Sequence, residues 1–501
     1  MAKDRAAERL PIPGQDALRD EVRDVVRLSP ASAEGLLMGA RRGATEVLAA
    51  FATAPRPSPQ ANAHAVGRVL QDTIGVAMAG VGTETGRLTL SWLETERAPG
   101  PAAVWGTGLR LAPSQAALVN GTTAHALDWD DAAPSMAMHP GAVLLPALLA
   151  QAAAEDVSGA RLVAAYNIGS AVFRAVSEAL PLPFHYGRGW HNTSSTGRLA
   201  ATAALAHLTG LDTGATRHAL GIAASCAAGS LANFGTMTKP LHAGLAARDA
   251  VTAIGLARRG FTANPHQLEA PRGFFAAYGD TSFELLATLG ERLAHWESAW
   301  TTDWALKRYP SCYATHLAID SALELRRRLA DPGPSRIARI RVSVPASSTS
   351  PLLDRLPVTG LEGKFSLAYT VARALVDGRV ELADFTDDRV LHDAAVRRLT
   401  DLFELERRDT DDDPTCSHTT VEVTLNDGQA QSHGADVTYG DARNPLTDAD
   451  LDAKFAAALA EADWNPAEAA ALGERLRRAT ATPSLAPLQD ALCWARGTPS
   501  W

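Results

Sequence analysis

The chain has 501 residues, a formal net charge of −9 and 46% hydrophobic residues. The negative charge argues against a nucleic-acid partner, and four scattered cysteines without a CxxC pair argue against a zinc cluster or a disulfide framework. The N-terminus lacks the apolar core of a secretory signal, and no apolar run reaches the roughly 18 residues of a membrane span, so we expect a cytoplasmic protein without a membrane partner.

The first 300 residues predict a helical domain. Residues 1–42 alternate charges with alanine and leucine and are expected to form an N-terminal extension. From residue 43, apolar residues recur at helical spacing between Gly, Pro and Asp breaks. The expected helices span residues 44–53, 61–79, 83–96, 113–128, 139–154, 159–179, 193–209, 212–228, 241–259 and 282–293. Because strand patterns are almost absent, residues 43–302 predict an all-helical domain.

A different pattern begins near Asp303. Helices are expected at 315–329, 365–376 and 388–403, and residues 338–346 alternate as a half-buried strand. Residues 418–437 predict a β-hairpin that turns at Asn426-Asp427-Gly428, and residues 448–495 return to helix. The predicted fold is therefore mainly α. Residues 43–302 and 438–501 would form a large helical domain from both chain ends, and residues 303–437 a smaller inserted α+β lid domain.

Residues 119–142 concentrate acidic and imidazole side chains: His125, Asp128, Asp130, Asp131 and His139. Helical spacing places Gly121, His125 and Asp128 near one face, and Pro134 then ends regular structure before a new helix. A carboxylate and an imidazole at adjoining helix ends can serve acid/base chemistry. The alternative is a capped, solvated turn between two helices, since carboxylates commonly cap helices. For His125 we favour a structural hydrogen bond to the backbone.

Lysine is rare in this chain. Of the 47 positively charged residues, 42 are arginines and five are lysines: Lys3, Lys239, Lys307, Lys364 and Lys454. Lysine is a compact point charge with a tunable pKa, and arginine does not replace it where that property is needed. Lys239, Lys307 and Lys364 each stand in a distinctive motif and are therefore candidates for function, with chance retention as the alternative.

Four further motifs carry concentrated chemistry. In GWHNTSSTG, His191 stands in a turn that opens a helix, where free N–H groups can bind an anion. TKPLHAG holds Lys239 and His242 before another helix. The last two motifs are KRYPSCYATH, with Lys307, Arg308, Tyr309, Cys312 and His316, and GKFSLAY, with Lys364 and Tyr369. The alternative for Cys312 and the tyrosines is core packing, and for Lys364 it is a structural tie within the lid.

Together these motifs resemble the MmgE/PrpD family of 2-methylcitrate dehydratases and cis-aconitate decarboxylases. The matching stretches follow one another in the family's order: NGTTAHALDWDD with HPG, GWHNTSSTG, TKPLHAG, KRYPSC, KFSLAY and GDARNPLTDADLDAKF. The resemblance implies a helical domain with an α+β lid and an active site in the cleft between them. It also implies a homodimer, a small carboxylate substrate, and catalysis without a metal, flavin or iron–sulfur cluster.

The resemblance also assigns roles to residues. Carried over by motif, the catalytic positions are Asp128, His139, His191, Lys239 and Lys307. Substrate-binding positions are expected at His242, Arg308, Cys312, Ala132 and Tyr309. Removing a proton beside a carboxylate creates an enolate-like dianion, which the lysines would stabilise. His139 or His191 is the natural acid/base, and Asp128 would orient an imidazole or act on a leaving hydroxyl; the sequence leaves these roles open.

Two positions depart from the family pattern. A threonine commonly follows the DWDD motif, where this chain has Ala132, and decarboxylase-like members carry a histidine where it has Cys312. Losing these polar groups suits a larger, less charged substrate. We expect a cofactor-free lyase or dehydratase of the carbon–oxygen lyase class that acts on a hydroxylated or unsaturated carboxylic acid. The alternatives are a cyclase or isomerase for a larger biosynthetic intermediate, a cis-aconitate-type decarboxylase, and a non-catalytic binding protein.

Overall fold

The computed structural model describes residues 42–56, 60–279, 286–409 and 418–493. The chain divides into two units, residues 1–43 and residues 44–501. Almost all of the first unit, and with it the predicted N-terminal extension, lies outside the described residues. The helices and strands that the structure describes belong to the second unit.

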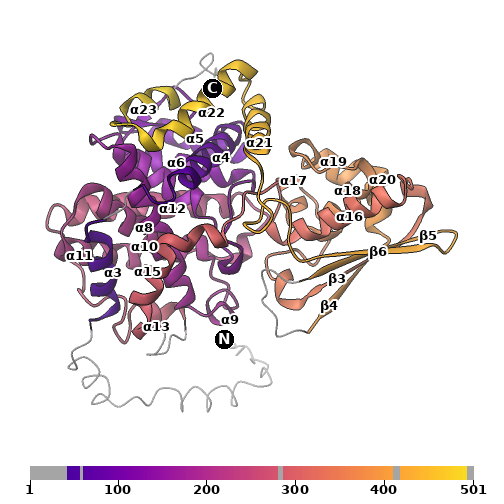
Figure 1. The fold of residues 1–501 in the computed structure, drawn as a ribbon, viewed down its shortest axis with the longest axis horizontal. Helices are drawn as coiled ribbons and strands as arrows, with labels where there is room; N and C mark the ends of the chain where they lie inside the picture. The colour runs from indigo at the N-terminus through magenta and orange to yellow at the C-terminus, as the bar shows by residue number, and fades with distance from the viewer. Residues whose placement is uncertain (1–41, 57–59, 280–285, 410–417, 494–501) are drawn as a thin grey trace, which may run out of the picture. The chain divides into compact units, whose positions relative to one another are not determined.

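The first part of the second unit is helical (Figure 1). Its helices are α3 (Ala44–Thr53), α4 (Ala63–Val81), α5 (Glu84–Glu96), α6 (Pro113–Ala126), α7 (Gly141–Ala152), α8 (Gly159–Glu178), α9 (Leu182–His185), α10 (Asn192–Thr209), α11 (Thr213–Ser225), α12 (Thr238–Ala257), α13 (Phe274–Tyr278) and α15 (Leu289–Ala299). Most predicted helices agree with these to within a few residues at each end. The helix predicted at 282–293 begins outside the described residues, and α15 runs beyond it. A short hairpin of β1 (Pro99–Ala103) and β2 (Arg110–Leu111) precedes α6.

Helices α6 and α12 pack closely because glycines meet where they touch. A Cβ atom on Gly121 would lie 2.8 Å from the Cα of Gly244, and one on Gly244 would lie 2.2 Å from the backbone oxygen of Leu118. Only a residue without a side chain permits this approach. The contact positions the site, because α6 ends just before Asp128 and the first turn of α12 carries Lys239.

A four-stranded sheet covered by helices forms the α+β part of the unit. Its elements are α16 (His316–Arg328), β3 (Ile337–Pro345), α17 (Gly360–Gly363), α18 (Leu367–Asp377), α19 (Asp387–His392), α20 (Ala394–Thr400), β4 (Phe403–Arg408), β5 (Thr419–Leu425) and β6 (Ala430–Ala435). The strand order is β4-β3-β5-β6, with β3 parallel to β4 and antiparallel to β5. Alternate residues such as Ile340, Val342 and Val421 enter a core shared with α16 and α18.

The helix predicted at 388–403 is wrong at its centre and its end. Asp393 interrupts it, because its carboxylate accepts hydrogen bonds from the amides of Ala395 and Val396 and starts a new helix. Strand β4 then begins at Phe403. The charges of FELERR hid this strand, since an edge strand keeps much of its surface in solvent. The hairpin of β5 and β6 is confirmed, with Gly428 at φ 88° in its turn.

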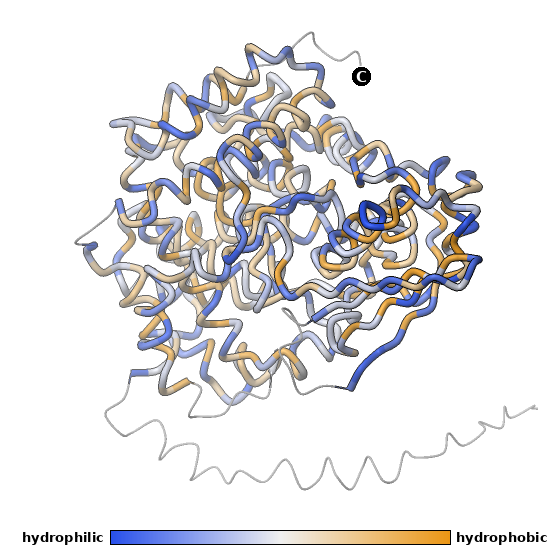
Figure 2. Tube along the Cα trace, turned by 45° about the vertical axis from the view of Figure 1, so that its right-hand side comes forward, coloured by the Kyte–Doolittle hydropathy of each residue, from blue (hydrophilic) through white to orange (hydrophobic). Residues whose placement is uncertain are grey.

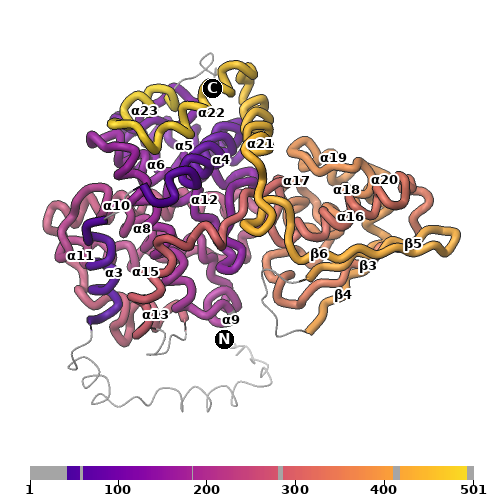
Figure 3. Tube along the Cα trace, in the orientation of Figure 1, coloured from indigo at the N-terminus to yellow at the C-terminus, as the bar shows by residue number. Residues whose placement is uncertain are grey.

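The C-terminal helices return to the helical part. α21 (Asp448–Ala460) and α22 (Pro466–Arg478) lie beside α4, and α23 (Ala486–Leu492) follows them (Figure 3). Phe455 and Leu476 share one hydrophobic core with Leu70 and Ile74 of α4. The fold is therefore mainly α with a smaller α+β part, as predicted, while the exact domain boundaries remain predictions.

Hydropathy follows the helical repeat. Figure 2 shows hydrophobic and hydrophilic positions alternating along the helices, which is typical of helices buried on one face. Among the described helices, none combines the length and the apolar composition that crossing a membrane requires.

Candidate active site

A turn follows directly after α6 at residues 127–129, which we call the lysine-bound turn. Asp128 adopts the left-handed backbone conformation, with φ 51°, which is uncommon for a residue other than glycine. Each of the three consecutive carbonyl oxygens accepts a hydrogen bond from a different lysine Nζ. The distances are 2.9 Å from Lys364 to Leu127, 2.8 Å from Lys307 to Asp128 and 2.7 Å from Lys454 to Trp129. Donors from three distant segments therefore hold this turn.

Every lysine in the described part of the chain is buried, although lysine is normally exposed. The exposed fractions are 3% for Lys239, 0% for Lys307, 4% for Lys364 and 8% for Lys454. All four contact the lysine-bound turn. The rare lysines of the described chain therefore gather at one turn of the backbone. Lys454 was not a candidate, although it lies in the matching stretch GDARNPLTDADLDAKF.

The carboxylate of Asp128 lies between two ammonium groups. Nζ of Lys239 donates to Oδ1 over 2.5 Å, and Nζ of Lys307 lies 3.2 Å from the same oxygen. Burial alone would raise the pKa of this carboxyl group, but the two lysines outweigh burial and lower the pKa well below its usual value. Asp128 is therefore ionised and stabilises both ammonium groups.

His139 lies in the segment that leads into α7, and its Nδ1 faces two acceptors. That nitrogen is 3.0 Å from the backbone oxygen of Asp131 and 3.3 Å from Oδ2 of Asp130. Burial, and then the charge of Lys307, lower the pKa of His139, so its imidazole is neutral at pH 7. A neutral ring between two acceptors carries its proton on Nδ1, which leaves the lone pair on Nε2.

Asp130 also holds a second imidazole. Nδ1 of His125 lies 2.9 Å from Oδ2 of Asp130, and the rings of His125 and His139 are 4.5 Å apart between centroids. Burial lowers the pKa of His125 to about 4, and Asp130 opposes this shift only in part. His125 makes a structural hydrogen bond, as predicted, but its partner is the carboxylate of Asp130 rather than the backbone.

The side chains around Asp130 also have the composition of a metal site. Ligand atoms of His125, Asp128, Asp130 and His139 all lie within 4.8 Å of one another. A divalent cation among them would lie next to the fixed charges of Lys239 and Lys307, which already neutralise Asp128. The arrangement is therefore better suited to orienting imidazoles than to holding a metal ion.

His191 and His242 form a pair of imidazoles. Their Nδ1 atoms are 3.1 Å apart, so one ring donates and the other accepts. Burial, assisted by Lys239, lowers the pKa of His191 well below its usual value, and burial lowers that of His242 to about 4. Two neutral rings satisfy this contact. His191 belongs to the wall of the cavity described next, whereas His242 lies behind it.

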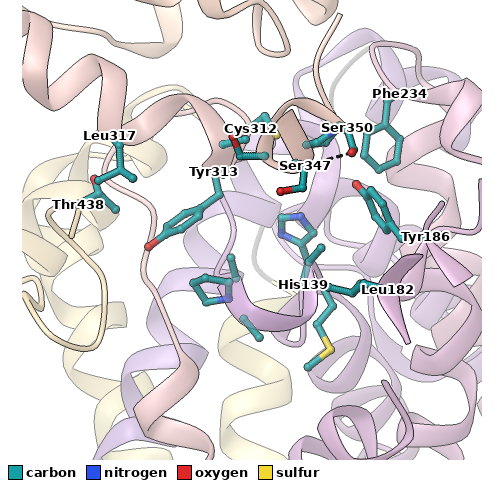
Figure 4. A pocket seen from close by; sticks show the side chains of 18 of the residues that line it. His139, Leu182, Tyr186, Phe234, Cys312, Tyr313, Leu317, Ser347, Ser350 and Thr438 are labelled. Atoms are coloured by element: carbon teal, nitrogen blue, oxygen red, sulfur yellow. Dashed lines mark hydrogen bonds between the residues drawn. The ribbon is translucent and has the colours of Figure 1, made fainter. Parts of the chain in front are cut away.

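His139, His191 and Lys239 line one cavity of about 320 Å³. The loop from Ala132 to Met138 supplies an apolar wall. Figure 4 shows His139 between Tyr313 on one side and Tyr186 on the other. The α+β part contributes residues on the other side: Cys312, Tyr313, Leu317, Ser347, Ser350 and Thr438. Asp128 and Lys307 lie behind this wall, and Asp128 contacts both Lys239 and Lys307.

The structure does not bring Arg308 and Tyr309 to the cavity. Arg308 is exposed, and its guanidinium lies over the rings of Tyr309 and Tyr439. The hydroxyl of Tyr309 donates to Asp320 over 2.6 Å, and its ring is part of the α+β core. The physical reason is that neighbouring residues of an extended segment point in opposite directions, so burying Lys307 turns Arg308 outward.

Several residues of the cavity wall were not candidates. Tyr186 and Phe234 are aromatic residues in loops, and Ser347 and Ser350 lie in a short turn after β3. Two signals were present in the sequence: Tyr186 precedes the His191 motif by a few residues, and the serine-rich run ASSTSP directly follows a predicted strand. Tyr369, by contrast, donates to the backbone of Asp384 and packs in the α+β core, which agrees with the alternative of core packing.

Comparison with known proteins places the chain in a family. The MmgE/PrpD N-terminal domain model matches residues 46–285, and the MmgE/PrpD C-terminal domain model matches residues 309–471. A cis-aconitate decarboxylase from Homo sapiens is 31% identical over 78% of this chain and 82% of its own length. A Mus musculus protein of that name is 32% identical over 78% of this chain and 81% of its own length, and one from Aspergillus terreus is 28% identical over 68% of this chain and 74% of its own length. The chain therefore belongs to the MmgE/PrpD family.

Proposed function

We propose that this protein is a lyase that removes a proton beside a carboxylate of a hydroxylated or unsaturated acid and then expels water. One observation carries the proposal: Nδ1 of His139 is held by two acceptors, so the lone pair lies on Nε2 of a residue in the cavity wall. Lys239 lines the same cavity. Family membership and the lyase names of the relatives support this class of chemistry.

In the proposed step, the substrate carboxylate lies against Lys239 and Nε2 of His139 takes the proton from the adjacent carbon. The electron pair of the broken C–H bond enters the carboxylate as an enolate-like dianion, which Lys239 and, behind it, Lys307 stabilise. That pair then forms a carbon–carbon double bond while the C–O bond breaks. The hydroxyl leaves as water with the proton that His139 had taken, or with one delivered through His191.

Decarboxylation is the second candidate, because the relatives are named cis-aconitate decarboxylases. In that reaction the bond to a carboxylate carbon breaks, carbon dioxide leaves, and the carbanion takes a proton from an imidazolium. Burial and Lys307 lower the pKa of His139, which opposes the protonated form. We therefore rank elimination first. A cyclase or isomerase would use the same proton removal without losing atoms, and the apolar wall at Ala132–Met138 supports it as a third candidate.

Product analysis separates these candidates. The full chain is incubated with 2-methylcitrate, citrate, cis-aconitate and a panel of 2-hydroxy and 3-hydroxy acids, and products are identified by mass spectrometry. Loss of water supports the proposal, loss of carbon dioxide selects decarboxylation, and a product of unchanged mass selects isomerisation or cyclisation. His139→Gln should lower the rate by roughly a hundredfold or more. His64→Gln, at an exposed histidine of α4, is the matched control.

The expected homodimer is likewise a proposal that rests on the family resemblance. Light scattering of the full chain in solution gives its mass directly. A mass of two chains supports the proposal, and a mass of one chain contradicts it.

A further inference from the structure

The charged groups of the cavity wall balance one another. Among the described residues, its cations are Lys239 and Arg443, and its carboxylates are Asp436 and Asp441. Lys239 is paired with Asp128 at 2.5 Å, and Nε of Arg443 lies 2.9 Å from Asp441. Each cation of the described wall is therefore already matched by a carboxylate.

Lys239 is the cation that can face a ligand beside the histidines, with Lys307 behind it. The two ammonium groups share the carboxylate of Asp128. His139 and His191 add no charge at pH 7, because burial lowers the pKa of each. This end of the cavity can compensate one carboxylate. A second or third carboxylate would have no cation of its own, and desolvating an unpaired carboxylate is costly.

The segment that carries Asp436 and Asp441 lies away from His139. Thr438, between these two aspartates, is on the opposite side of Tyr313 from His139 in Figure 4. The hydroxyl of Tyr313 donates to Asp441 over 3.0 Å. Arg443 already pairs with Asp441, and among the described residues Asp436 has only Nδ1 of His418, at 2.7 Å. A polycarboxylate that reached from Lys239 toward this segment would therefore place negative charge beside Asp436, which disfavours binding.

The uncharged part of the wall is apolar along Ala132–Met138, and the α+β side adds hydroxyl groups but no further cation among the described residues. The apolar residues include Ala132, Ala133, Ala137, Met138, Leu182 and Phe234. Cys312, which is buried, lines the α+β side. The volume of about 320 Å³ lies at the lower end of the range of small-molecule pockets, which are lined mainly by hydrophobic side chains with a few polar groups. Such a wall gains free energy by removing hydrocarbon from water rather than by pairing charges.

We infer that the substrate is a monocarboxylic acid with an extended apolar body, not a di- or tricarboxylic acid. The position of its carboxylate beside Lys239 rests on the proposed function. The apolar body lies along Ala132–Met138 and contacts Leu182 and Phe234. Among the described residues of the wall, no cation remains for a second carboxylate once Arg443 is paired with Asp441, and this disfavours citrate-like acids.

Calorimetric titration of the full chain tests this substrate class with defined probes. Propanoate, 3-phenylpropanoate, octanoate, citrate and cis-aconitate are compared at one pH and ionic strength. Octanoate and 3-phenylpropanoate should bind at least tenfold more tightly than citrate and cis-aconitate. Affinity should rise about fourfold for each CH₂ group added to propanoate until the cavity is filled. A smaller ratio, tighter binding of either polycarboxylate, or no binding of octanoate overturns the inference.

Charge variants test the reason for the preference. Asp436→Asn should raise the affinity for citrate severalfold and leave that for octanoate unchanged. Asp388→Asn removes the same charge from an exposed position outside the cavity wall and should change neither affinity. Ala132→Thr and Cys312→His should shift the preference toward citrate. If the Asp388 variant acts like the Asp436 variant, the effect is general electrostatics and the inference fails.

The substrate class and the proposed reaction fail in different ways. If octanoate binds with the predicted preference but proton removal does not depend on His139, the proposed reaction is wrong and the inferred substrate class is supported. If His139→Gln abolishes turnover of cis-aconitate, and citrate or cis-aconitate binds more tightly than octanoate, the inferred substrate class is wrong and the proposed role of His139 is supported.

Discussion

Lys307 donates a 2.8 Å hydrogen bond to the backbone oxygen of Asp128 and lies 3.2 Å from the carboxylate of the same residue. One ammonium group thereby fixes both the conformation and the charge of this aspartate. Burial opposes the charged lysine, but Asp128 and Asp130 outweigh burial and raise the pKa of Lys307. The contact also joins the end of α6 to a segment far along the chain.

Replacing Lys307 by methionine should damage stability and activity together. Removing one partner of a buried ion pair costs about 3–5 kcal/mol, because the other charge remains buried. Loss of a fixed charge behind Lys239 should also lower kcat by roughly a hundredfold or more. Urea unfolding and steady-state kinetics measure the two effects. Arg327→Met, on the exposed face of α16, should change neither. A wild-type kcat in the Lys307 variant would remove this lysine from charge stabilisation.

Lys454 ties the C-terminal helix α21 to the same turn. Its Nζ donates to the backbone oxygen of Trp129 and lies 2.6 Å from Oδ1 of Asp72. Lys454→Met should therefore lower the free energy of unfolding by about 3–5 kcal/mol. The double variant Asp72→Asn/Lys454→Met should be less destabilised than the sum of the single variants, since it leaves no unpaired charge. Strictly additive losses in urea unfolding would show that the two residues act independently.

The sequence predicted helices better than it predicted the geometry of the site. Periodicity located α6 and α12, and the motifs named His139, His191 and Lys239, which line the cavity, and Lys307, which lies behind it; their catalytic roles remain predictions. Three lysines that bind three consecutive carbonyl oxygens could not be predicted, because that arrangement depends on how distant segments pack. For the same reason, spacing alone could not show that Arg308 points away from the cavity. Strand β4 was missed because its charged residues obscured the alternation of an edge strand.

Two buried groups, His125 and Asp131, should contribute to the pH dependence of the free energy of unfolding with opposite signs. The pKa of His125 falls to about 4, so between pH 6.5 and 4 the unfolded chain binds a proton that the folded chain refuses. His125 therefore makes the free energy of unfolding fall as pH falls through this window. Burial raises the pKa of Asp131 to about 7, so the folded chain binds the extra proton and this group acts in the opposite direction from pH 4 to pH 7.

Urea unfolding between pH 7 and pH 4 measures these contributions as differences from the wild type. The slope of unfolding free energy against pH should decrease in His125→Asn and increase in Asp131→Asn. His64→Gln, at an exposed position, should keep the wild-type slope. Slopes that change in the same direction in the first two variants would contradict the assigned shifts.

The glycine contact between α6 and α12 gives a structural prediction with a control on the same helix. A Cβ atom on Gly244 would lie 2.2 Å from the backbone oxygen of Leu118, so Gly244→Ala must push the helices apart. Overpacking of this kind costs about 1–3 kcal/mol and should move Lys239 relative to Asp128, which lowers kcat. A Cβ atom on Gly255 would meet only a flexible arginine atom at 3.8 Å. Gly255→Ala should therefore be neutral or stabilising by up to about 1 kcal/mol. Equal effects in the two variants would contradict the packing account.

The most direct test of the central claim is solvent deuterium incorporation at the carbon beside the substrate carboxylate, followed by NMR in D₂O. If Nε2 of His139 is the base, the wild type and His64→Gln should exchange this position at the same rate. His139→Gln, whose side-chain amide can still donate to the acceptors of Nδ1 but which lacks a basic nitrogen at pH 7, should exchange it at least a hundredfold more slowly. Exchange at the wild-type rate in the His139 variant would show that another group removes the proton.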